Sequence, residues 1–281
     1  MKLSCLPVSF FADIIAGRMS LASWAAMGAR LGLDAIDLSI LLVPDRSPSA
    51  VAAARREIEA QGMRVAMVTS YPDFTHPDPA QRERELVMEQ EVVAVAAGLG
   101  ASLVRVTTGQ AHPETGRDEG IAWAVDGLCR LAEATRDLGV TLAYENHSKP
   151  GAWTYTDFAE KPDTFLAVAR GIAPAGIGIN FDAGNAATFA DDPVALLDQV
   201  VDRAVSIHAS DSATKGHLQH VLLGTGITPY PALFRRLARA GWDGWICIEE
   251  ASNQGEAGAA AAVRFVRETW QAAQAPSGDA P

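Results

Sequence analysis

Short apolar segments and segments of helical composition alternate eight times along this chain of 281 residues. Regular alternation of this kind is typical of parallel strands joined by helical crossovers. Eight such units in about 250 residues is the size of a closed (β/α)8 barrel, so the sequence predicts an α/β fold of that type. The predicted strands lie at residues 3–10, 33–39, 64–70, 102–109, 141–146, 177–184, 204–211 and 245–250.

The segments between these strands carry the start and stop signals of helices. The longest runs from a capping aspartate, Asp78, to a glycine stop at Gly98 or Gly100. An open doubly wound sheet is the alternative, but neither of the glycine-rich phosphate-binding patterns GxGxxG and GxxxxGKS/T occurs. No linker interrupts the pattern, so we expect one barrel domain over residues 1–272 and a disordered tail over 273–281.

The charge balance argues against one class of partner. The formal net charge is −11, with 23 Lys and Arg against 34 Asp and Glu, so binding to a nucleic-acid backbone is not expected. No run approaches the ~20 apolar residues needed to cross a bilayer. Pro7 and Asp13 interrupt the apolar N-terminal segment, which favours a first strand over a signal peptide. The three cysteines have no CxxC spacing, which indicates a reduced compartment and a cytoplasmic protein.

Four of the later predicted strands end in residues of metal-binding type, namely Glu145, Asp182, His208 and Glu249. The carboxyl ends of barrel strands meet on one face, so these side chains are expected to converge. Taken singly, such an aspartate is more often a helix cap and such a histidine a satisfied core group. Four ligand types on successive strands favour a site instead. Three carboxylates and an imidazole suit one divalent cation and would not stay buried unpaired.

Several short motifs around these residues occur in the order found in a known family. The motifs are Glu145-Asn146-His147, Phe181-Asp182-Ala183-Gly184-Asn185, His208-Ala209-Ser210-Asp211, Leu223-Gly224-Thr225-Gly226 and Ile248-Glu249-Glu250. From Leu3 to about Ala272 the chain resembles the sugar phosphate isomerase/epimerase group of the xylose-isomerase-like TIM barrels, which is related to ketose 3-epimerases, inosose dehydratases and AP endonucleases. The resemblance implies that the four strand-end residues bind one manganese, magnesium, cobalt or zinc ion, and the oxygen and nitrogen ligands fit these metals independently.

Such a site next to two glutamates implies proton transfer beside a carbonyl group. A divalent cation that coordinates the carbonyl and adjacent hydroxyl oxygens stabilises an enediolate, and a placed carboxylate removes the α-proton. Glu145 and Glu249 are predicted to abstract and return that proton from opposite sides. The chain is therefore predicted to be a metal-dependent isomerase or epimerase of carbohydrate metabolism, acting on a sugar or sugar phosphate.

Three other functions stay open from the sequence. A metal-dependent dehydratase or lyase acting on an inosose or keto-sugar would share the deprotonation and then expel a β-hydroxyl group. An AP endonuclease is disfavoured by the acidic balance, and a non-catalytic sugar-binding barrel would not need both glutamates. Ketose 3-epimerases usually carry a histidine at the position of Asn185 and an arginine near that of Lys215, which puts free-ketose 3-epimerisation in doubt.

Further polar residues follow the strand ends. Lys149 and Arg105 are weaker candidates for the site, and either Asp211 or the neighbours of Asp182 are expected to support the ring of His208. The partners expected by the resemblance are a small carbohydrate and, by analogy only, further copies of the chain. The residues predicted to bind substrate are His147, Asn185, Lys215 and His220.

Overall fold

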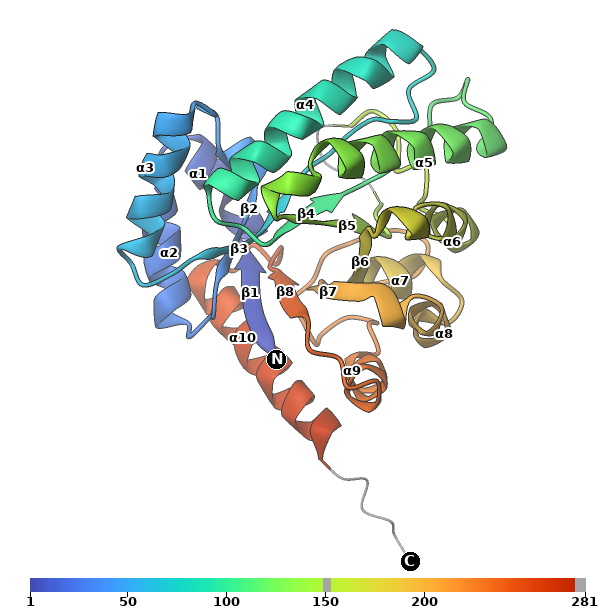
Figure 1. The fold of residues 1–281 in the computed structure, drawn as a ribbon. Coiled ribbons are helices and arrows are strands. Elements are labelled where there is room, and N and C mark those ends of the chain that lie inside the picture. Colours follow the sequence, from blue (N-terminus) through green and yellow to red (C-terminus); the bar gives the residue numbers. More distant parts are fainter. Residues whose placement is uncertain (149–152, 276–281) are drawn as a thin grey trace, which may run out of the picture.

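Eight parallel strands form one sheet in the computed structural model of the protein, which describes residues 1–148 and 153–275 (Figure 1). Their order is β1-β8-β7-β6-β5-β4-β3-β2. Between the outermost two, the carbonyl of Leu3 accepts hydrogen bonds from the amides of Asp34 and Ala35, at 2.9 and 3.3 Å. The sheet is therefore a nearly closed barrel, which confirms the predicted fold. The strands are β1 (Lys2–Leu6), β2 (Ile36–Ser39), β3 (Val65–Thr69), β4 (Leu103–Val106), β5 (Thr141–Glu145), β6 (Gly178–Asp182), β7 (Ala204–Ala209) and β8 (Trp245–Glu249).

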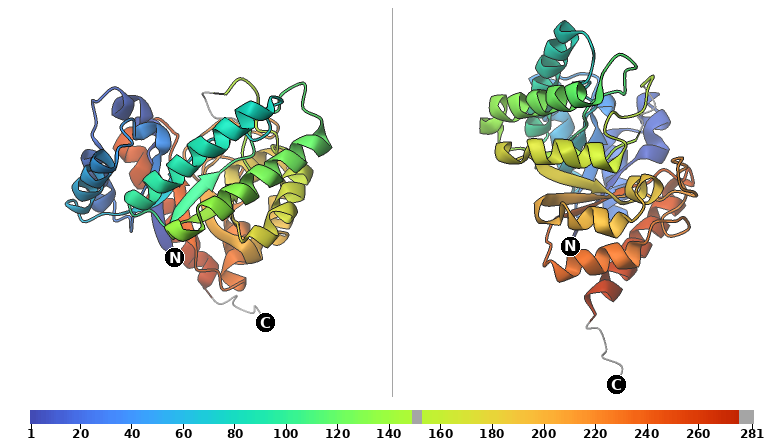
Figure 2. Two further views of the ribbon diagram at one scale, coloured as in Figure 1. Left: turned by 45° about the horizontal axis from the view of Figure 1, so that its top comes forward. Right: turned by 90° about the vertical axis from the view of Figure 1, so that its right-hand side faces the viewer.

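Helices lie around the outside of the strands in all three views (Figures 1 and 2). Five of the described helices begin at a capping side chain that accepts a backbone N–H of the first turn, namely Ser20, Ser47, Asp78, Asp182 or Asp192. The helices are α1 (Phe11–Ile15), α2 (Leu21–Arg30), α3 (Pro48–Glu59), α4 (Pro79–Gly98), α5 (Arg117–Ala134), α6 (Pro162–Gly171), α7 (Ala183–Phe189), α8 (Pro193–Asp198), α9 (Tyr230–Arg239) and α10 (Gly255–Gln274).

The structure corrects the predicted boundaries at both ends of the chain. The first predicted strand, residues 3–10, stops before Pro7, because proline has no N–H to offer the ladder, and Val8–Phe10 forms a 3-10 helix. At the other end, α10 continues to Gln274, two residues into the predicted tail. Residues 276–281 of that predicted tail lie outside the described part. These corrections leave the eight-unit pattern intact.

Apolar side chains pack in two separate places. The larger cluster includes Leu38, Val104 and Phe181 and lies between strands and helices. The smaller cluster contains side chains of β3, β4 and β8, and because β3 and β8 are not neighbours in the sheet, its contacts cross the barrel interior. This inner cluster fills the barrel toward the starts of the strands. Its buried members are Ala35, Ala66, Met67, Leu103, Trp245 and Cys247.

A buried carboxyl group on α4 makes stability depend on pH. Burial raises the pKa of Glu89 from 4.5 to about 7, and a hydrogen bond with Ser70 only partly opposes this. The folded protein therefore binds this proton more tightly than the unfolded chain. The resulting stabilisation is complete below about pH 4.5, the unfolded value, and is lost as the pH rises through about 7.

We expect Glu89→Gln to change the free energy of unfolding little at pH 5 and to raise it by roughly 2–3 kcal/mol at pH 8, because the amide carries no charge to bury. Urea denaturation of both proteins at the two pH values measures the difference. If the gain in the free energy of unfolding at pH 8 is no larger than that at pH 5, the raised pKa assigned to Glu89 is contradicted.

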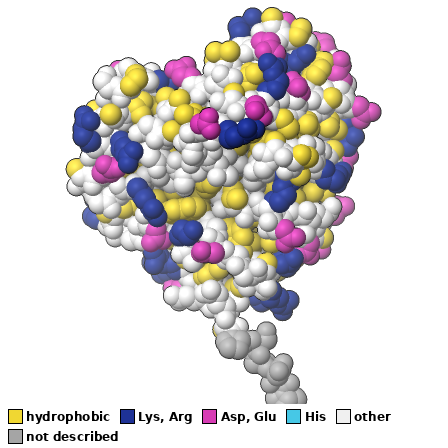
Figure 3. All heavy atoms as spheres, in the orientation of Figure 1, with side chains coloured by type: hydrophobic (Ala, Val, Ile, Leu, Met, Phe, Trp, Pro, Cys, Tyr) yellow, Lys and Arg dark blue, Asp and Glu magenta, His cyan; other side chains and the backbone are white. Residues whose placement is uncertain are grey.

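Charged side chains of both signs are interspersed on the face of the molecule drawn in Figure 3. This face therefore offers no continuous positive stripe that a phosphate backbone could follow. Among the described residues, no helix is long and apolar enough to cross a membrane.

Candidate active site

Three of the four predicted cation ligands lie together at the C-terminal ends of neighbouring strands. Glu145 ends β5, Asp182 ends β6 and His208 lies on β7, and one ligand atom of each lies within 4.8 Å of the others. The register explains this convergence, because Asp182 pairs with His208 across the ladder and Glu145 pairs with Asn180, two residues earlier on β6. All three side chains are buried. We name this group the strand-end cluster.

The fourth predicted ligand, Glu249, ends β8, the strand next to β7. It is partly exposed and does not belong to the compact group of three. Its charge nevertheless acts on that group, since burial and then Glu249 raise the pKa of Asp182 well above its usual value. Glu249 therefore borders the cluster on the β8 side, and its part as a ligand stays a prediction.

Two cationic neighbours keep Glu145 ionised. Burial alone would raise its pKa, but the Arg105 guanidinium and then the His208 ring outweigh burial and lower it. His208 Nδ1 lies 2.5 Å from Glu145 Oε1, and Arg105 Nε lies 3.1 Å from Oε2. Burial by itself would lower the pKa of His208, but the Glu145 carboxylate raises it by more, so that the pKa is about 9. The ring is thus protonated near neutral pH, and a cation bound through it must displace a proton.

Each residue of the strand-end cluster carries a buried polar atom that makes no hydrogen bond within the described part of the chain. Asp182 Oδ2 and His208 Nε2 have no partner there, and Glu145 Oε2 has only the ion-pair contact with Arg105. Leaving such atoms unsatisfied costs about 1–3 kcal/mol each, and more where a charge is buried, so folded proteins rarely keep several of them together. Two carboxylates and an imidazole are ligands that manganese, magnesium, cobalt and zinc accept. The residues present therefore fit a divalent cation.

Two asparagines hold the cluster in place. Asn146 bonds to both the amide and the carbonyl of Asp182, each at 2.8 Å, which continues the pairing beyond the end of β5. Asn180 Nδ2 donates to Glu145 Oε1 at 2.6 Å. Asp182 Oδ1 accepts from the amide of Asn185 at 2.7 Å and so caps α7, while no described residue forms a hydrogen bond with Oδ2. The helix-cap and ligand interpretations of Asp182 are therefore compatible.

His147 lies beside the cluster, between two carboxylates. Its Nε2 is 4.0 Å from Glu145 Oε2 and its Nδ1 is 3.7 Å from Asp157 Oδ2. The other oxygen of Asp157, Oδ1, accepts hydrogen bonds from the Thr108 hydroxyl and the amide of Ala159, both at 2.7 Å. Asp157 is not among the residues that the sequence indicates, because its position depends on how the segment before α6 pairs with the segment after β4, where the amide of Phe158 donates to the carbonyl of Gly109 at 2.8 Å.

The other predicted substrate-binding residues have different surroundings. Asn185 is buried in the first turn of α7, and its amide oxygen has no partner among the described residues. Lys215 donates to two backbone carbonyls just beyond the C-terminal end of the same helix, both at 3.1 Å. His220 is half-buried in the loop between β7 and α9. Substrate contact by His147, Asn185, Lys215 or His220 stays a prediction, and the weaker candidate Lys149 lies outside the described residues.

The prediction that Asp211 supports His208 is wrong, because its carboxylate organises the loop between β7 and α9. It accepts four backbone N–H groups at 2.9 to 3.0 Å, whereas His208 pairs with Glu145. The loop that follows β7 at the barrel rim is thus tied to one buried anion. The donors are the amides of Ser212, Gly224, Gly226 and Thr228.

Asp211→Ala is expected to lower the free energy of unfolding by about 3 kcal/mol or more, because four loop amides lose a charged acceptor. Urea denaturation provides the measurement. Asp243→Ala is the matched control, since that side chain is 79% exposed, and it should change stability by less than about 0.5 kcal/mol. Equal effects of the two substitutions would refute the assigned role.

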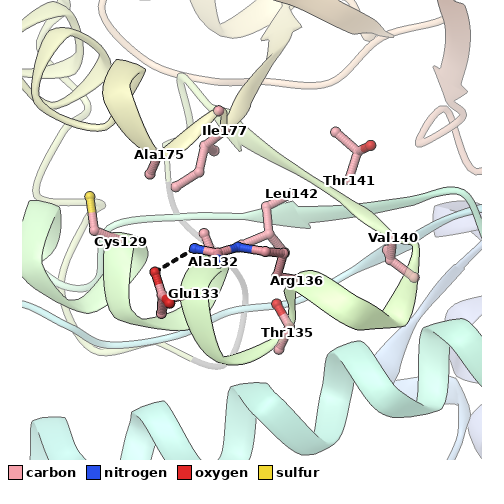
Figure 4. A pocket seen from close by; sticks show the side chains of 11 residues that line it. Cys129, Ala132, Glu133, Thr135, Arg136, Val140, Thr141, Leu142, Ala175 and Ile177 are labelled. Carbon is pink, nitrogen blue, oxygen red and sulfur yellow. Dashed lines mark hydrogen bonds and ion pairs between the residues drawn. The ribbon is translucent and has the colours of Figure 1, made fainter.

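A cavity of about 230 Å³ lies at the other end of the barrel (Figure 4). Its lining includes Thr141, at the opposite end of β5 from Glu145, and the 2.6 Å ion pair of Glu133 with Arg136. Barrel enzymes act at the C-terminal ends of their strands. This cavity is therefore separate from the strand-end cluster.

Known proteins of related sequence share parts of this chain. A family model described as xylose isomerase-like TIM barrel matches residues 25–269. A putative hydroxypyruvate isomerase from Streptomyces coelicolor is 23% identical over 250 residues, which covers 84% of this chain and 88% of that protein. An inosose dehydratase from Lacticaseibacillus casei is 23% identical over 147 residues, or 47% of each protein. The chain spans about half the length of the first curated relatives that it matches.

Solved structures extend the likeness over nearly the whole chain. A D-tagatose 3-epimerase-like protein superimposes with a TM-score of 0.78, covering 97% of this chain and 98% of that one, at 18% sequence identity. At this identity, the likeness concerns the fold alone. It includes the strands that carry the strand-end cluster.

Proposed function

The chain belongs to the xylose isomerase-like TIM barrel family, and from that premise we propose that it is a divalent-metal-dependent isomerase or epimerase of a sugar or sugar phosphate. The observation that carries the proposal is the strand-end cluster, in which one ligand atom of each of three buried side chains lies within 4.8 Å of the others. Within it, Asp182 Oδ2 and His208 Nε2 have no hydrogen-bond partner among the described residues. Such an arrangement is unfavourable for the fold alone, which supports a role in binding a cation.

Glu145, Asp182 and His208 would hold the cation, with Glu249 completing the set from β8. When bound, a divalent cation supplies Lewis-acid polarisation of the oxygens next to the reacting carbon. Asp182 suits this role because one of its oxygens caps α7 and the other has no hydrogen-bond partner in the part of the chain that the structure describes. Asn180 supports Glu145 through Oε1 in the same way.

The two glutamates differ in exposure, and this difference suits one to remove a proton and the other to return one. Glu249 is partly exposed, so its carboxylate can reach a substrate carbon, whereas Glu145 is buried against Arg105. We assign proton removal to Glu249 and proton return to Glu145. Because Glu145 is ionised in the cation-free chain, it must first take up a proton from solvent, while Glu249 releases the abstracted proton to solvent. Return to the same carbon on its other face inverts that centre, and return to the neighbouring carbon moves the carbonyl group.

A dehydratase is the second candidate, and the sequence likeness to an inosose dehydratase favours it. The same proton removal would be followed by departure of a β-hydroxyl group. His147, next to Glu145 and backed by Asp157, is placed to donate a hydrogen bond to such an oxygen. Free-ketose 3-epimerisation is less favoured, because Asn185 stands where the resemblance expects a histidine.

We further propose a small carbohydrate as substrate, manganese, magnesium, cobalt or zinc as the cation, and the cytoplasm as the location. The oxygen-rich ligand set supports the choice of metals, and the acidic balance supports a role without nucleic acid. Homo-oligomeric assembly and the absence of a membrane partner stay predictions.

The test is a screen of ketoses, inososes and 3-keto sugars, free and phosphorylated, in deuterated water. Chelator-treated protein receives each of the four cations in turn, and NMR follows substrate and product. We expect cation-dependent entry of one solvent deuterium at the reacting carbon, together with an isomeric product. A product that differs from the substrate by the loss of water would assign the dehydratase instead. Turnover that does not depend on a cation, or purified protein that binds none, would overturn the proposal.

A further inference from the structure

Arg105 is a charged residue within β4, a strand whose residues are all buried. Its side chain is 2% exposed, and it is one of the largest fully buried side chains in the described chain. A buried guanidinium is strongly unfavourable unless it is paired and hydrogen-bonded. Its partners therefore indicate what this charge does.

Three groups surround the guanidinium. Its Nη1 donates to the carbonyl of Ser70 at 2.7 Å, and its carbon lies 4.7 Å from the centroid of the Tyr71 ring. Its Nε lies 3.1 Å from Glu145 Oε2. Tyr71 is held in turn, because its hydroxyl lies 3.4 Å from that of Ser39 and 3.3 Å from that of Thr69. The guanidinium is therefore fixed from the β3 side and directed at one carboxylate.

That carboxylate belongs to the strand-end cluster. Arg105 contacts its Oε2, and Asn180 donates to its Oε1 at 2.6 Å. Glu145 is thus held at both oxygens by groups other than His208. These two contacts fix the Glu145 carboxylate without any contribution from His208.

We propose that Arg105 is a positioning residue, which holds the Glu145 carboxylate in the orientation that faces Asp182 and His208, so that the cation site is formed before the cation arrives. The inference rests on the proposed function, since it takes those residues to be the ligands. Removing a group that orients a metal ligand typically weakens metal affinity by about 10- to 100-fold.

A simple charge argument predicts the opposite sign. A guanidinium beside the site repels a divalent cation, so its removal would tighten binding if charge alone mattered. If orientation dominates, removal weakens binding even though a repulsive charge has gone. The sign of the change therefore separates a positioning residue from a group that only neutralises Glu145.

The experiment measures Mn²⁺ affinity of the full chain by isothermal titration calorimetry, with the EPR spectrum of bound Mn²⁺ as a second readout. We expect about 10- to 100-fold weaker binding in Arg105→Met, with an altered spectrum. Arg105→Lys keeps the charge but loses the planar guanidinium that stacks and bonds, and we expect about tenfold weaker binding there. Arg82→Met is the matched control, because Arg82 stacks on Trp123 at 3.8 Å between α4 and α5, and its affinity should equal that of the wild type.

Tyr71→Leu decides the matter if circular dichroism shows that the Arg105 variants do not fold. It keeps the guanidinium and removes the ring beside it, and we expect about two- to fivefold weaker binding. Equal or tighter Mn²⁺ binding in a folded Arg105 variant, or unchanged binding in Tyr71→Leu when that variant decides, overturns the inference alone. Wild-type protein that binds no Mn²⁺ overturns both the inference and the proposed function.

Discussion

Glu249→Gln is expected to lower turnover by about 10²–10⁴-fold while the barrel stays folded, because glutamine keeps the shape of the side chain and removes the base. Glu249 is partly exposed at the end of β8, so the substitution leaves little buried charge unpaired. The measurement is the rate at which solvent deuterium enters the reacting carbon at saturating cation and substrate. Cation affinity is determined separately, so that lost binding is not mistaken for lost chemistry.

Glu145→Gln, studied in parallel, should lose exchange to a similar extent and also lose stability. Its carboxylate is buried, and Arg105 and His208 would each lose a charged partner. Glu256→Gln is the control, because Glu256 is half-exposed on α10 and pairs with Arg30 away from the strand ends. Undiminished exchange in both site variants would remove their assigned role.

Asp182→Asn is expected to have opposite effects on cation binding and on stability. Cation affinity should fall by roughly 100-fold or more, because losing a direct ligand costs at least as much as losing a group behind one. The metal-free protein should become more stable at neutral pH. Burial, then Glu249 and Glu145, raise the pKa of Asp182 well above its usual 3.8, so the ionised form is disfavoured in the folded state.

The sign follows from proton linkage. A carboxyl whose pKa is raised by folding stabilises the protein fully below about pH 3.8, its unfolded value, and this contribution is lost as the pH rises through the folded value. Asparagine carries no proton to lose and still offers Oδ1 to the amide of Asn185. Denaturation of both proteins at pH 5 and pH 8, without added metal, should show a gain that grows with pH. Wild-type Mn²⁺ affinity in the variant, or a stability gain that does not grow between the two pH values, would contradict the prediction.

The fold and the composition of the cluster were predictable because both follow from one regularity. Parallel strands in a closed barrel place their carboxyl ends on one face, so Glu145, Asp182 and His208 had to approach one another once their strands were recognised. Glu249 obeys the same rule and still stands apart from the compact group. The rule fixes the face of the barrel but not the depth of each side chain.

The supporting residues were not predictable in the same way. Arg105 is visible in the sequence as a charge within an apolar strand, yet its role depends on Ser70 and Tyr71, which the loop after β3 brings to it. Asp157 reaches His147 only through the path of a loop. Such contacts depend on loop conformation, which strand periodicity does not encode.

The small inner cluster around Met67, Leu103 and Trp245 determines from which end small molecules can reach the barrel interior. Its apolar side chains close one end of the barrel. Substrate, product, water and cation would therefore all have to enter and leave at the other end. Substitutions in this inner cluster should therefore change the melting temperature without changing the substrate preference. Changes in preference would come instead from the loops that frame the open mouth.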